Sequence, residues 1–365
     1  MTSITIVHNN VDQASSIGKL ASWAVETALN EAWHVTVVAR DLDPEFRQHV
    51  EWRLLYVPPR LHALQWSVAR PTVLRAMRGV RSDVLHVYQP QLAAIADTWH
   101  VEYLSRVAME TQVSEPTKGV RWRLARLQQT AVAKMEDRYL KDIGERPTAL
   151  FCSEQMRDHF TRLYGAPHYA EILHNPAFPA PLSRHRQPEL SRASLGLATD
   201  AFVVGFLGGV DSRKGYEDAI AAVAGLPGGI LLMAGPGSAG YGSAQLGHRL
   251  VSLGLLSDLT DFWGSCDVLV VPSRFDPFAM VVTEAASHGV PVVVTPAVGA
   301  SSLVQWHRAG EVAKVDDLTQ ALQGVRRNPG AYSAGLGRLV SDLSAGHLSA
   351  QLLSSWHDAA ARNHR

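Results

Sequence analysis

Cysteine is scarce in this chain: its 365 residues include only Cys152 and Cys266, each flanked by apolar residues of the kind found in strands. Two such cysteines form neither a disulfide framework nor a metal site, so we expect buried thiols in a reducing compartment. No stretch reaches the roughly 18 consecutive apolar residues of a membrane-spanning helix. The first 20 residues contain Asp12 and no continuous apolar core, which predicts no signal peptide and a cytoplasmic location.

Net charge is also absent, because 34 basic and 34 acidic side chains cancel. A neutral chain has no general attraction for polyanions, so we expect no nucleic-acid partner. The hydrophobic content of 46% is that of an ordinary globular protein. A chain of this length exceeds one typical hydrophobic core and predicts two domains.

Strand-like and helix-like segments alternate through the first half of the chain. The expected elements are strands at Ile4–His8, His34–Ala39, Trp52–Val57, Val84–Tyr88 and Ala149–Ser153, and helices at Ser16–Glu31, Leu61–Gly79 and Val120–Tyr139. Alternation of this kind predicts an α/β domain, in which helices cover both faces of a parallel sheet.

A second series of the same kind starts near residue 201. Its expected elements are strands at Ala201–Leu207, Ile230–Ala234 and Leu250–Leu253, and helices at Tyr216–Ala224 and near Ser257–Gly264. Between the two series, Pro176–Ser194 holds four prolines and little apolar periodicity, which is typical of a domain boundary. We therefore expect domains at residues 1–182 and 183–348.

The most informative segment is 267–303, DVLVVPSRFDPFAMVVTEAASHGVPVVVTPAVGASSL. It predicts a strand (Val268–Pro272), a polar loop, a helix (Phe278–His288) and a second strand (Val290–Thr295), with Gly289 at the end of the helix in a positive-φ conformation. Asp276 lies in the loop and Glu284 lies in the helix. An acid beside the free N–H groups of a helix start can hold a sugar hydroxyl while those N–H groups bind phosphate. The segment therefore predicts a nucleotide-sugar site.

This segment resembles the acid-x7-acid signature of retaining family 4 glycosyltransferases, P-S-x-x-E-P-F-G-x-x-x-x-E-A-x-x-x-G-x-P-V-V. The chain keeps Pro272, Ser273, Pro277, Phe278, Glu284, Ala285, Gly289, Pro291, Val292 and Val293. It departs at the first acid, Asp276, which is one methylene shorter, and at Ala279, which replaces glycine but suits a helix start. The resemblance implies the GT-B fold, two Rossmann-like domains facing a central cleft. It also implies that the last helix, 349–365, packs back onto the first domain.

The resemblance assigns roles to further residues of the second domain. In Gly205–Asp218, the turn residues Arg213 and Lys214 can neutralise a leaving diphosphate, and their Arg-Lys-Gly sequence is similar to lipopolysaccharide-core glucosyltransferases. The helix start at Phe278, Ala279 and Met280 would help to hold the diphosphate. Glu284 would bind ribose, Asp276 a sugar hydroxyl, and Leu255 the nucleotide base.

In the first domain the resemblance points to two places. The loop after the first strand carries Ser16 where the family has a glycine that approaches donor phosphate; capping of the following helix is the alternative. The apolar stretch Leu92–Asp97 predicts a strand ending at the cleft. Asp97 at its end is our first candidate for the reacting centre, and His100 is the second.

Three other features have competing interpretations. Gly235, Gly237 and Gly240, followed by Asp258, have the spacing of a dinucleotide site and would suit an oxidoreductase, although Pro236 stiffens that loop. Asp41-Leu42-Asp43 has the form of a metal-binding D-x-D motif, but we interpret it as a solvated loop. The region Arg53–Arg126 carries eleven basic and five acidic residues, which suits an ordinary solvated face, an anionic acceptor or a membrane surface.

The sequence therefore predicts a metal-independent, retaining glycosyltransferase that uses a nucleotide-sugar donor, with a UDP-sugar favoured. The acceptor would be the hydroxyl of a small molecule, a glycan or a lipid-linked sugar, and the basic region would permit peripheral contact with the inner face of a membrane. A nucleotide-sugar epimerase on the same fold and a degenerate, non-catalytic partner subunit are the alternatives.

Overall fold

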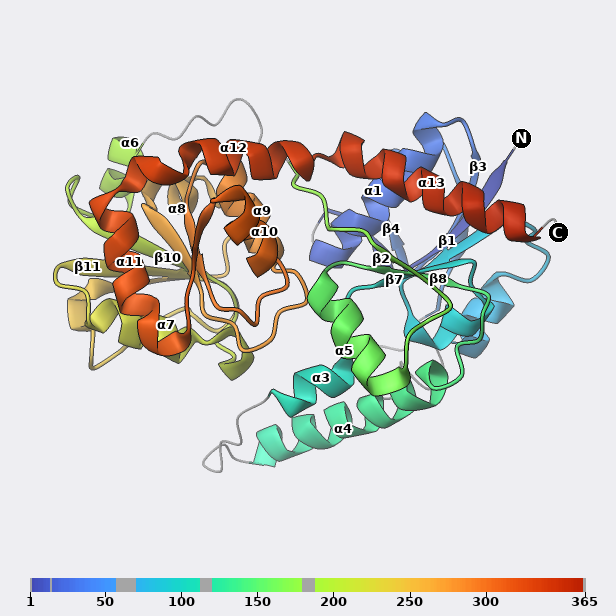
Figure 1. Ribbon diagram of the computed structural model, residues 1–365, viewed down its shortest axis with the longest axis horizontal. Helices are drawn as coiled ribbons and strands as arrows, with labels where there is room; N and C mark the ends of the chain where they lie inside the picture. Colours follow the sequence, from blue (N-terminus) through green and yellow to red (C-terminus); the bar gives the residue numbers. More distant parts are fainter. Residues whose placement is uncertain (1, 14, 57–69, 112–119, 179–187, 364–365) are drawn as a thin grey trace. The chain divides into compact units, whose positions relative to one another are not determined.

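The computed structural model describes residues 2–13, 15–56, 70–111, 120–178 and 188–363 (Figure 1). The chain divides into two compact units. The first comprises residues 1–175, apart from 111–113, together with Ala345–Arg365, and the second comprises Pro176–Ser344 with 111–113. The chain thus passes from one unit to the other inside the proline-rich segment and returns at the start of the last helix.

The described part of the first unit contains a parallel seven-stranded sheet in the order β5-β3-β1-β6-β7-β8-β9. The strands are β1 (Ser3–Val7), β3 (His34–Ala39), β5 (Glu51–Leu54), β6 (Val84–Val87), β7 (Thr98–Val101), β8 (Thr148–Phe151) and β9 (Tyr169–Ile172), and a separate short pair joins β2 (Asn10–Val11) to β4 (Asp41–Leu42). Central strands β6, β7 and β8 are buried at every position, as expected for a sheet covered on both faces.

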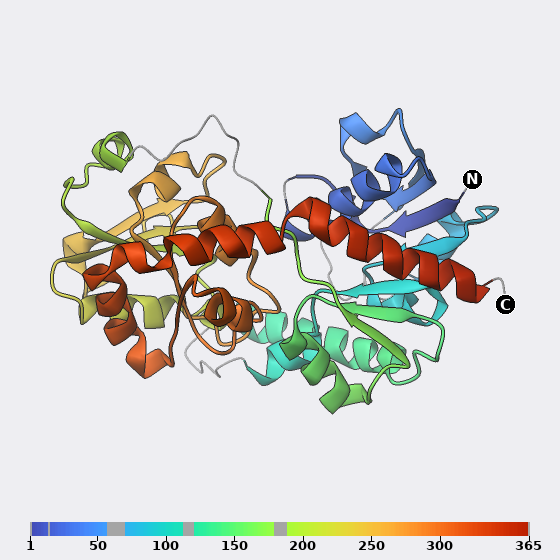
Figure 2. The ribbon, with the colours of Figure 1, turned by 45° about the horizontal axis from the view of Figure 1, so that its top comes forward.

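The helices of the first unit follow the strands in βα alternation. They are α1 (Ser16–Asn30), a described helical piece at 70–76, α3 (Ser105–Glu110), α4 (Val120–Leu140), α5 (Glu154–Tyr164) and α13 (Ala345–Asn363). Helix α13 lies beside α1 and contacts β6 and β7 (Figures 1 and 2). Its Trp356 is fully buried and donates from Nε1 to Nδ1 of His86 at 3.2 Å, so the last helix completes the core of this unit.

The second unit has a parallel six-stranded sheet in the order β12-β11-β10-β13-β14-β15. The strands are β10 (Phe202–Leu207), β11 (Gly229–Ala234), β12 (Leu250–Gly254), β13 (Val268–Val271), β14 (Val292–Val294) and β15 (Gly310–Val312). The helices are α6 (Pro188–Ser194), α7 (Tyr216–Ala224), α8 (Thr260–Ser265), α9 (Met280–Ser287), α10 (Ser301–His307), α11 (Leu318–Arg327) and α12 (Ser333–Asp342).

Both sheets have the strand order of a Rossmann-like domain. The order reverses between β1 and β6 in the first unit and between β10 and β13 in the second. Ligands of such sheets bind beyond the carboxyl ends of the strands at this reversal. The loops after these four strands are therefore the places to look for a site.

One element was predicted wrongly in a way that matters for function. Leu92–Asp97 does not form a strand: Pro90–Ile95 forms the 3-10 helix η2, and the strand β7 starts only at Thr98. Pro90 occupies the first turn of η2, where its fixed φ and missing N–H are tolerated. Of the predicted helix Leu61–Gly79, residues 61–69 lie outside the described residues, and 70–76 are helical.

Candidate functional site

In the second unit, the loops after β10 and β13 bring two predicted donor-site residues together. The Nζ atom of Lys214 donates to Oδ2 of Asp276 at 2.6 Å. The Asp276 side chain is 7% exposed and that of Lys214 is 27% exposed, so the ammonium group also faces solvent. An ammonium group has three N–H donors, and this ion pair uses one of them. The pair can therefore bind further anionic or hydroxyl oxygens.

Gly215 explains why these two loops can approach so closely. It has φ 70°, and a Cβ at this position would collide with the backbone carbonyl of Pro272. The contact is reinforced by two hydrogen bonds: Arg274 N donates to Arg213 O at 2.8 Å, and Arg213 Nη1 donates to Phe275 O at 2.9 Å. The sequence Arg-Lys-Gly thus places both cations against the loop that carries Asp276.

The backbone of Asp276 is held from the other side by the loop after β14. Asp276 N donates to Ala297 O at 3.1 Å, and Gly299 N donates to Asp276 O at 2.8 Å. With both backbone groups fixed, the carboxylate has a defined position. It is nevertheless committed to Lys214, so we expect the pair to act on a ligand as one unit.

Helix α9 begins beside this pair. Ala279 is its N-cap and adopts a left-handed conformation, with φ 67° and ψ 76°. The expectation that alanine suits this position as an ordinary helix start was therefore wrong, because left-handed backbone costs an alanine about 1–2 kcal/mol. Met280 is the first helical residue; Val282 N donates to Ala279 O at 2.9 Å, and the N–H groups of Met280 and Val281 precede this first bond of the helix. Glu284 lies about one turn further along the helix and is half-buried.

Two other predicted donor-site residues lie elsewhere in the fold, one in each unit. Leu255 follows β12, which is separated from β10 by β11, and its side chain is 77% exposed. Ser16 belongs to the first unit and is exposed at the start of α1. Its neighbour Ser15 is the residue that caps this helix, accepting a hydrogen bond from Gly18 N at 3.0 Å.

The glycines with dinucleotide-like spacing have a structural explanation. Gly235 and Gly237 have φ values of 130° and 81°, and a Cβ on Gly235 would collide with the carbonyl of Gly208. These glycines allow the loop after β11 to pack on the loop after β10. Asp258 accepts hydrogen bonds from Thr260 at the start of α8, at 2.9 Å from N and 2.6 Å from Oγ1. Gly235 and Gly237 therefore have a packing role at the strand ends.

In the first unit, Asp97 lies at the opposite edge of the sheet from the position that we expected. It immediately precedes β7, so it is at the amino edge, and it is 3% exposed. Its carboxylate accepts hydrogen bonds from Leu85 N at 2.7 Å, Arg146 Nε at 3.0 Å and Asn363 Nδ2 at 2.9 Å. These contacts tie β6, the segment before β8 and α13 together.

His100 lies in the carboxyl half of β7, in a group of buried rings. Its ring centroid is 5.3 Å from that of Tyr88 and 6.1 Å from that of His86. Burial lowers the pKa of His100 to about 4, so the imidazole is neutral at physiological pH. His100, and not Asp97, is thus the predicted residue that approaches the carboxyl edge.

Sequence reasoning missed two polar residues at this edge. Glu102 follows β7, and its Oε1 lies 3.1 Å from Nε2 of His100. Asn175 follows β9, and its Nδ2 donates to Oε2 of Glu102 at 2.9 Å. Correct placement of the strand at Thr98–Val101 would have put Glu102 at the carboxyl edge and indicated it as a candidate.

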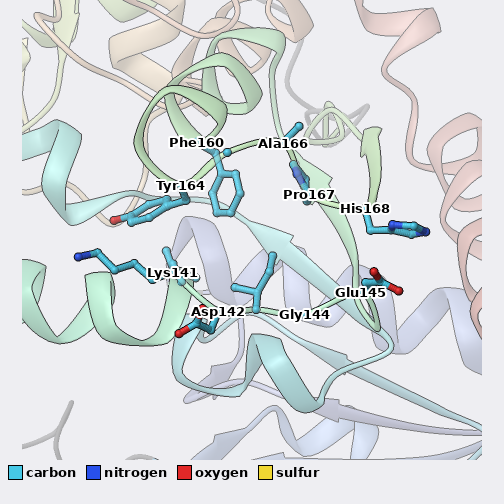
Figure 3. A pocket seen from close by; sticks show the side chains of 12 residues that line it. Lys141, Asp142, Gly144, Glu145, Phe160, Tyr164, Ala166, Pro167 and His168 are labelled. Atoms are coloured by element: carbon cyan, nitrogen blue, oxygen red, sulfur yellow. The ribbon is translucent and has the colours of Figure 1, made fainter.

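A separate hollow of about 430 Å³ lies at the amino edge of the first sheet (Figure 3). Phe160 and Tyr164 of α5 form one side, and the segment from Lys141 to Glu145 forms the other. The Tyr164 hydroxyl donates to Asp137 at 2.8 Å and is therefore already engaged. Because this hollow precedes the strands instead of following them, it is not where a Rossmann-like sheet binds its ligand.

The chain resembles solved structures along nearly its whole length. WaaG, a glycosyltransferase involved in lipopolysaccharide biosynthesis, matches with a TM-score of 0.72 and 16% identity, covering 98% of each chain. HepE of Anabaena, in complex with UDP-glucose, matches with a TM-score of 0.70 and 16% identity, covering 98% of this chain and 100% of HepE. Together with the two Rossmann-like units, this likeness shows that the chain has the GT-B fold.

Sequence comparison is more specific for the second unit. Residues 201–328 match the family model described as glycosyl transferases group 1. The D-inositol 3-phosphate glycosyltransferase of Mycobacterium tuberculosis (strain ATCC 25618 / H37Rv) is 28% identical over 227 residues, covering 56% of this chain and 45% of that relative. The match therefore spans less than half of the relative's length. The group 1 segment contains every predicted donor-site residue of the second unit.

Proposed function

We propose that the protein is a retaining family 4 glycosyltransferase that transfers a sugar from a UDP-sugar to an acceptor hydroxyl. The observation that carries this proposal is the Lys214–Asp276 pair, which lies at the strand-order reversal of the second sheet beside the start of α9. A cation, a carboxylate and free helix N–H groups are the groups that a sugar diphosphate requires. The match of residues 201–328 and the likeness to a UDP-glucose complex support the choice of donor.

In this proposal the second unit binds the donor. Lys214, Arg213 and the N–H groups at Ala279 and Met280 stabilise the diphosphate, and Asp276 orients a hydroxyl of the transferred sugar. Glu284 accepts hydrogen bonds from the ribose. The bond between the anomeric carbon and the phosphate oxygen breaks, and the bond to the acceptor oxygen forms on the same face. The acceptor proton passes to the departing phosphate.

We propose no metal ion in this reaction, because the two cations and the helix start supply positive charge at the diphosphate. The D-x-D sequence has other partners: Asp41 pairs with Arg40 at 2.6 Å, and Asp43 caps a 3-10 helix. Transfer should therefore survive EDTA. Loss of activity with EDTA that manganese restores would contradict this part of the proposal.

Of the two predicted candidates for the reacting centre we propose His100 in place of Asp97, because His100 lies toward the carboxyl edge, buried beside Glu102. His100→Ala should lower transfer by about 10²-fold, the size expected for a positioned polar group, while UDP affinity stays unchanged. Asp97→Asn is the comparison variant. If Asp97→Asn abolishes transfer in folded protein and His100→Ala does not, the original order of the two candidates is correct.

A lipid-linked acceptor or a membrane surface is supported by helix α4. Its Leu124 and Leu127 are 55% and 66% exposed, and Arg126 is exposed beside them. None of the helices in the described part of the chain is long and apolar enough to cross a membrane. We therefore propose peripheral contact, tested by co-sedimentation with anionic vesicles. Leu127→Glu should weaken this co-sedimentation, and wild-type protein that never sediments would contradict the proposal.

One assay separates the proposed enzyme from its alternatives. Incubation with UDP-glucose should release UDP, together with free or transferred glucose. An epimerase would instead convert the donor to another UDP-sugar, and a non-catalytic subunit would leave it intact.

Calorimetry with UDP alone tests the donor site first: Glu284→Ala should weaken UDP binding by about 1.5–3 kcal/mol through loss of charge-assisted hydrogen bonds. Unchanged affinity in this variant would remove Glu284 from the site.

A further inference from the structure

The carboxyl edge of the first sheet carries a positioned acid. Glu102 accepts a hydrogen bond at Oε2 from Nδ2 of Asn175 (2.9 Å), and its Oε1 lies 3.1 Å from Nε2 of His100. The side chain of His100 is fully buried and that of Glu102 is 9% exposed, while Asn175 is 1% exposed as a residue. The carboxylate is therefore fixed from behind and keeps a small exposed surface. A rigid acid at a strand end is arranged to meet a ligand.

Buried polar atoms of residues that follow the neighbouring strands also lack hydrogen-bond partners. Among the described residues at this edge, these buried atoms are Oδ1 of Asn175, Oε1 of Gln91 and both amide atoms of Gln89. His100 Nε2 is close to Glu102 but not aligned for a hydrogen bond. Buried polar groups in folded proteins are almost always paired. Gln89 follows β6, the strand next to β7, and Asn175 follows β9, so both amides come after the carboxyl ends of strands of the same sheet, as Glu102 does.

The chemistry of these groups defines what they would bind. Amide oxygens accept hydrogen bonds, amide nitrogens donate them, and a carboxylate accepts strongly. A ligand with many hydroxyl groups can satisfy all of them, because each hydroxyl both donates and accepts. A phosphate group would instead be repelled by the Glu102 carboxylate, since like charges in a buried site are costly.

We propose that Glu102 contacts the acceptor hydroxyl, that Asn175 is its positioning residue, and that the acceptor enters as an uncharged polyhydroxyl group. This inference rests on the proposed function and adds the acceptor class to it. The carboxylate accepts a hydrogen bond from the attacking hydroxyl and orients its oxygen. The proton still leaves to the departing phosphate, so Glu102 is unchanged at the end of the reaction.

The first test uses Glu102→Gln, which keeps the shape and removes the charge. Transfer is measured as UDP release from UDP-glucose in the presence of glucose or inositol as acceptor. It should fall by about 10²-fold, while the UDP affinity measured by calorimetry and the thermal midpoint stay unchanged. Glu102→Asp should recover part of the rate. Glu145→Gln is the matched control, an exposed acid at the amino edge of the same unit, and should behave as wild type. Normal transfer by Glu102→Gln overturns the proposal.

The role of Asn175 is tested by measuring kcat and the KM of each substrate for its alanine variant. Asn175→Ala frees the Glu102 carboxylate to move, so the acceptor KM should rise and kcat should fall, with unchanged KM for UDP-glucose. A merely structural role would lower the thermal midpoint and leave both constants of the folded enzyme intact. That second result overturns the positioning role.

The acceptor class is tested with pairs of probes: glucose and glucose 6-phosphate, and inositol and inositol 3-phosphate. In the transfer assay, the uncharged member of each pair should raise UDP release from UDP-glucose more than its phosphorylated counterpart does. In a separate binding assay with UDP present, the uncharged member should raise the thermal midpoint more. In Glu102→Gln, the responses to the uncharged and the phosphorylated member of each pair should be more alike than in wild type. Preference for the phosphorylated member, or no response to any uncharged probe, overturns the acceptor class. Failure of wild-type protein to bind UDP is a separate result that overturns the proposed function, and this inference with it.

Discussion

At the scale of single residues, Ala279 carries a cost that the sequence did not reveal. It lies at φ 67° at the start of α9, where the related signature has glycine. Ala279→Gly should raise the free energy of unfolding by about 0.5–1 kcal/mol, because relief of left-handed strain exceeds the entropy that glycine adds to the unfolded chain. Urea denaturation measures the change.

The matched control for this substitution is Ala221→Gly, an exposed position inside α7 with ordinary helical backbone. Here glycine should lower the free energy of unfolding by about 1 kcal/mol. If both variants are destabilised to the same extent, Ala279 is not strained.

The Lys214–Asp276 pair is also a residue-scale feature with a measurable consequence. Lys214→Ala removes a cation from the diphosphate and leaves a nearly buried carboxylate without its partner. We expect turnover to fall more than donor affinity, because negative charge on the leaving group grows in the transition state. Steady-state kinetics and UDP calorimetry on Lys214→Ala, Asp276→Ala and the double variant measure the coupling. Effects that simply add would show that the two side chains act independently.

At the scale of elements, Asp97 joins three parts of the first unit. It accepts hydrogen bonds from the backbone at Leu85, from Arg146 and from Asn363 of α13. Asp97→Asn should therefore lower the free energy of unfolding by about 1–3 kcal/mol, since buried donors lose a charged acceptor. Transfer per folded molecule should be preserved. The experiment compares urea midpoints with specific activity corrected for the folded fraction.

Element boundaries explain both the success and the failure of the sequence predictions. Long apolar runs between glycine and proline residues fixed β10, β11 and β13 to within a residue or two, and the acid-x7-acid spacing then located Asp276 and Glu284. Leu92–Asp97 is equally apolar, but Pro90 starts a 3-10 turn there. Because the strand was predicted too early in the chain, Asp97 was assigned to the carboxyl edge of the sheet and Glu102 was not recognised as a candidate. Contacts such as Lys214–Asp276 depend on Gly215 fitting against Pro272, which no sequence spacing reports.

At the scale of the whole molecule, the first unit contains buried groups whose shifted pKa values change the stability of the fold in opposite directions as the pH falls. Burial lowers the pKa of His100 to about 4 and that of His86 well below its ordinary value. The unfolded chain therefore binds protons first as the pH falls below about 6.5, so these histidines destabilise the fold in acid. Burial raises the pKa of Glu136 from 4.5 to about 7, despite hydrogen bonds from Ser105 and Arg106. Between pH 7 and 4.5 the folded state takes up this proton first, which stabilises the fold as the pH falls.

Removing Glu136 should expose the contribution of the histidines. In Glu136→Gln, the neutral amide keeps the shape but takes up no proton. The stabilisation that Glu136 gives the folded state as the pH falls is therefore lost. The drop in the free energy of unfolding between pH 7.5 and pH 5 should be larger than in wild type by about 1–3 kcal/mol, as expected for a raised pKa of this size. Urea denaturation at the two pH values measures the drop, with the exposed Glu145→Gln as the control. An identical pH dependence in Glu136→Gln and wild type would mean that Glu136 titrates near its ordinary pKa in the folded protein.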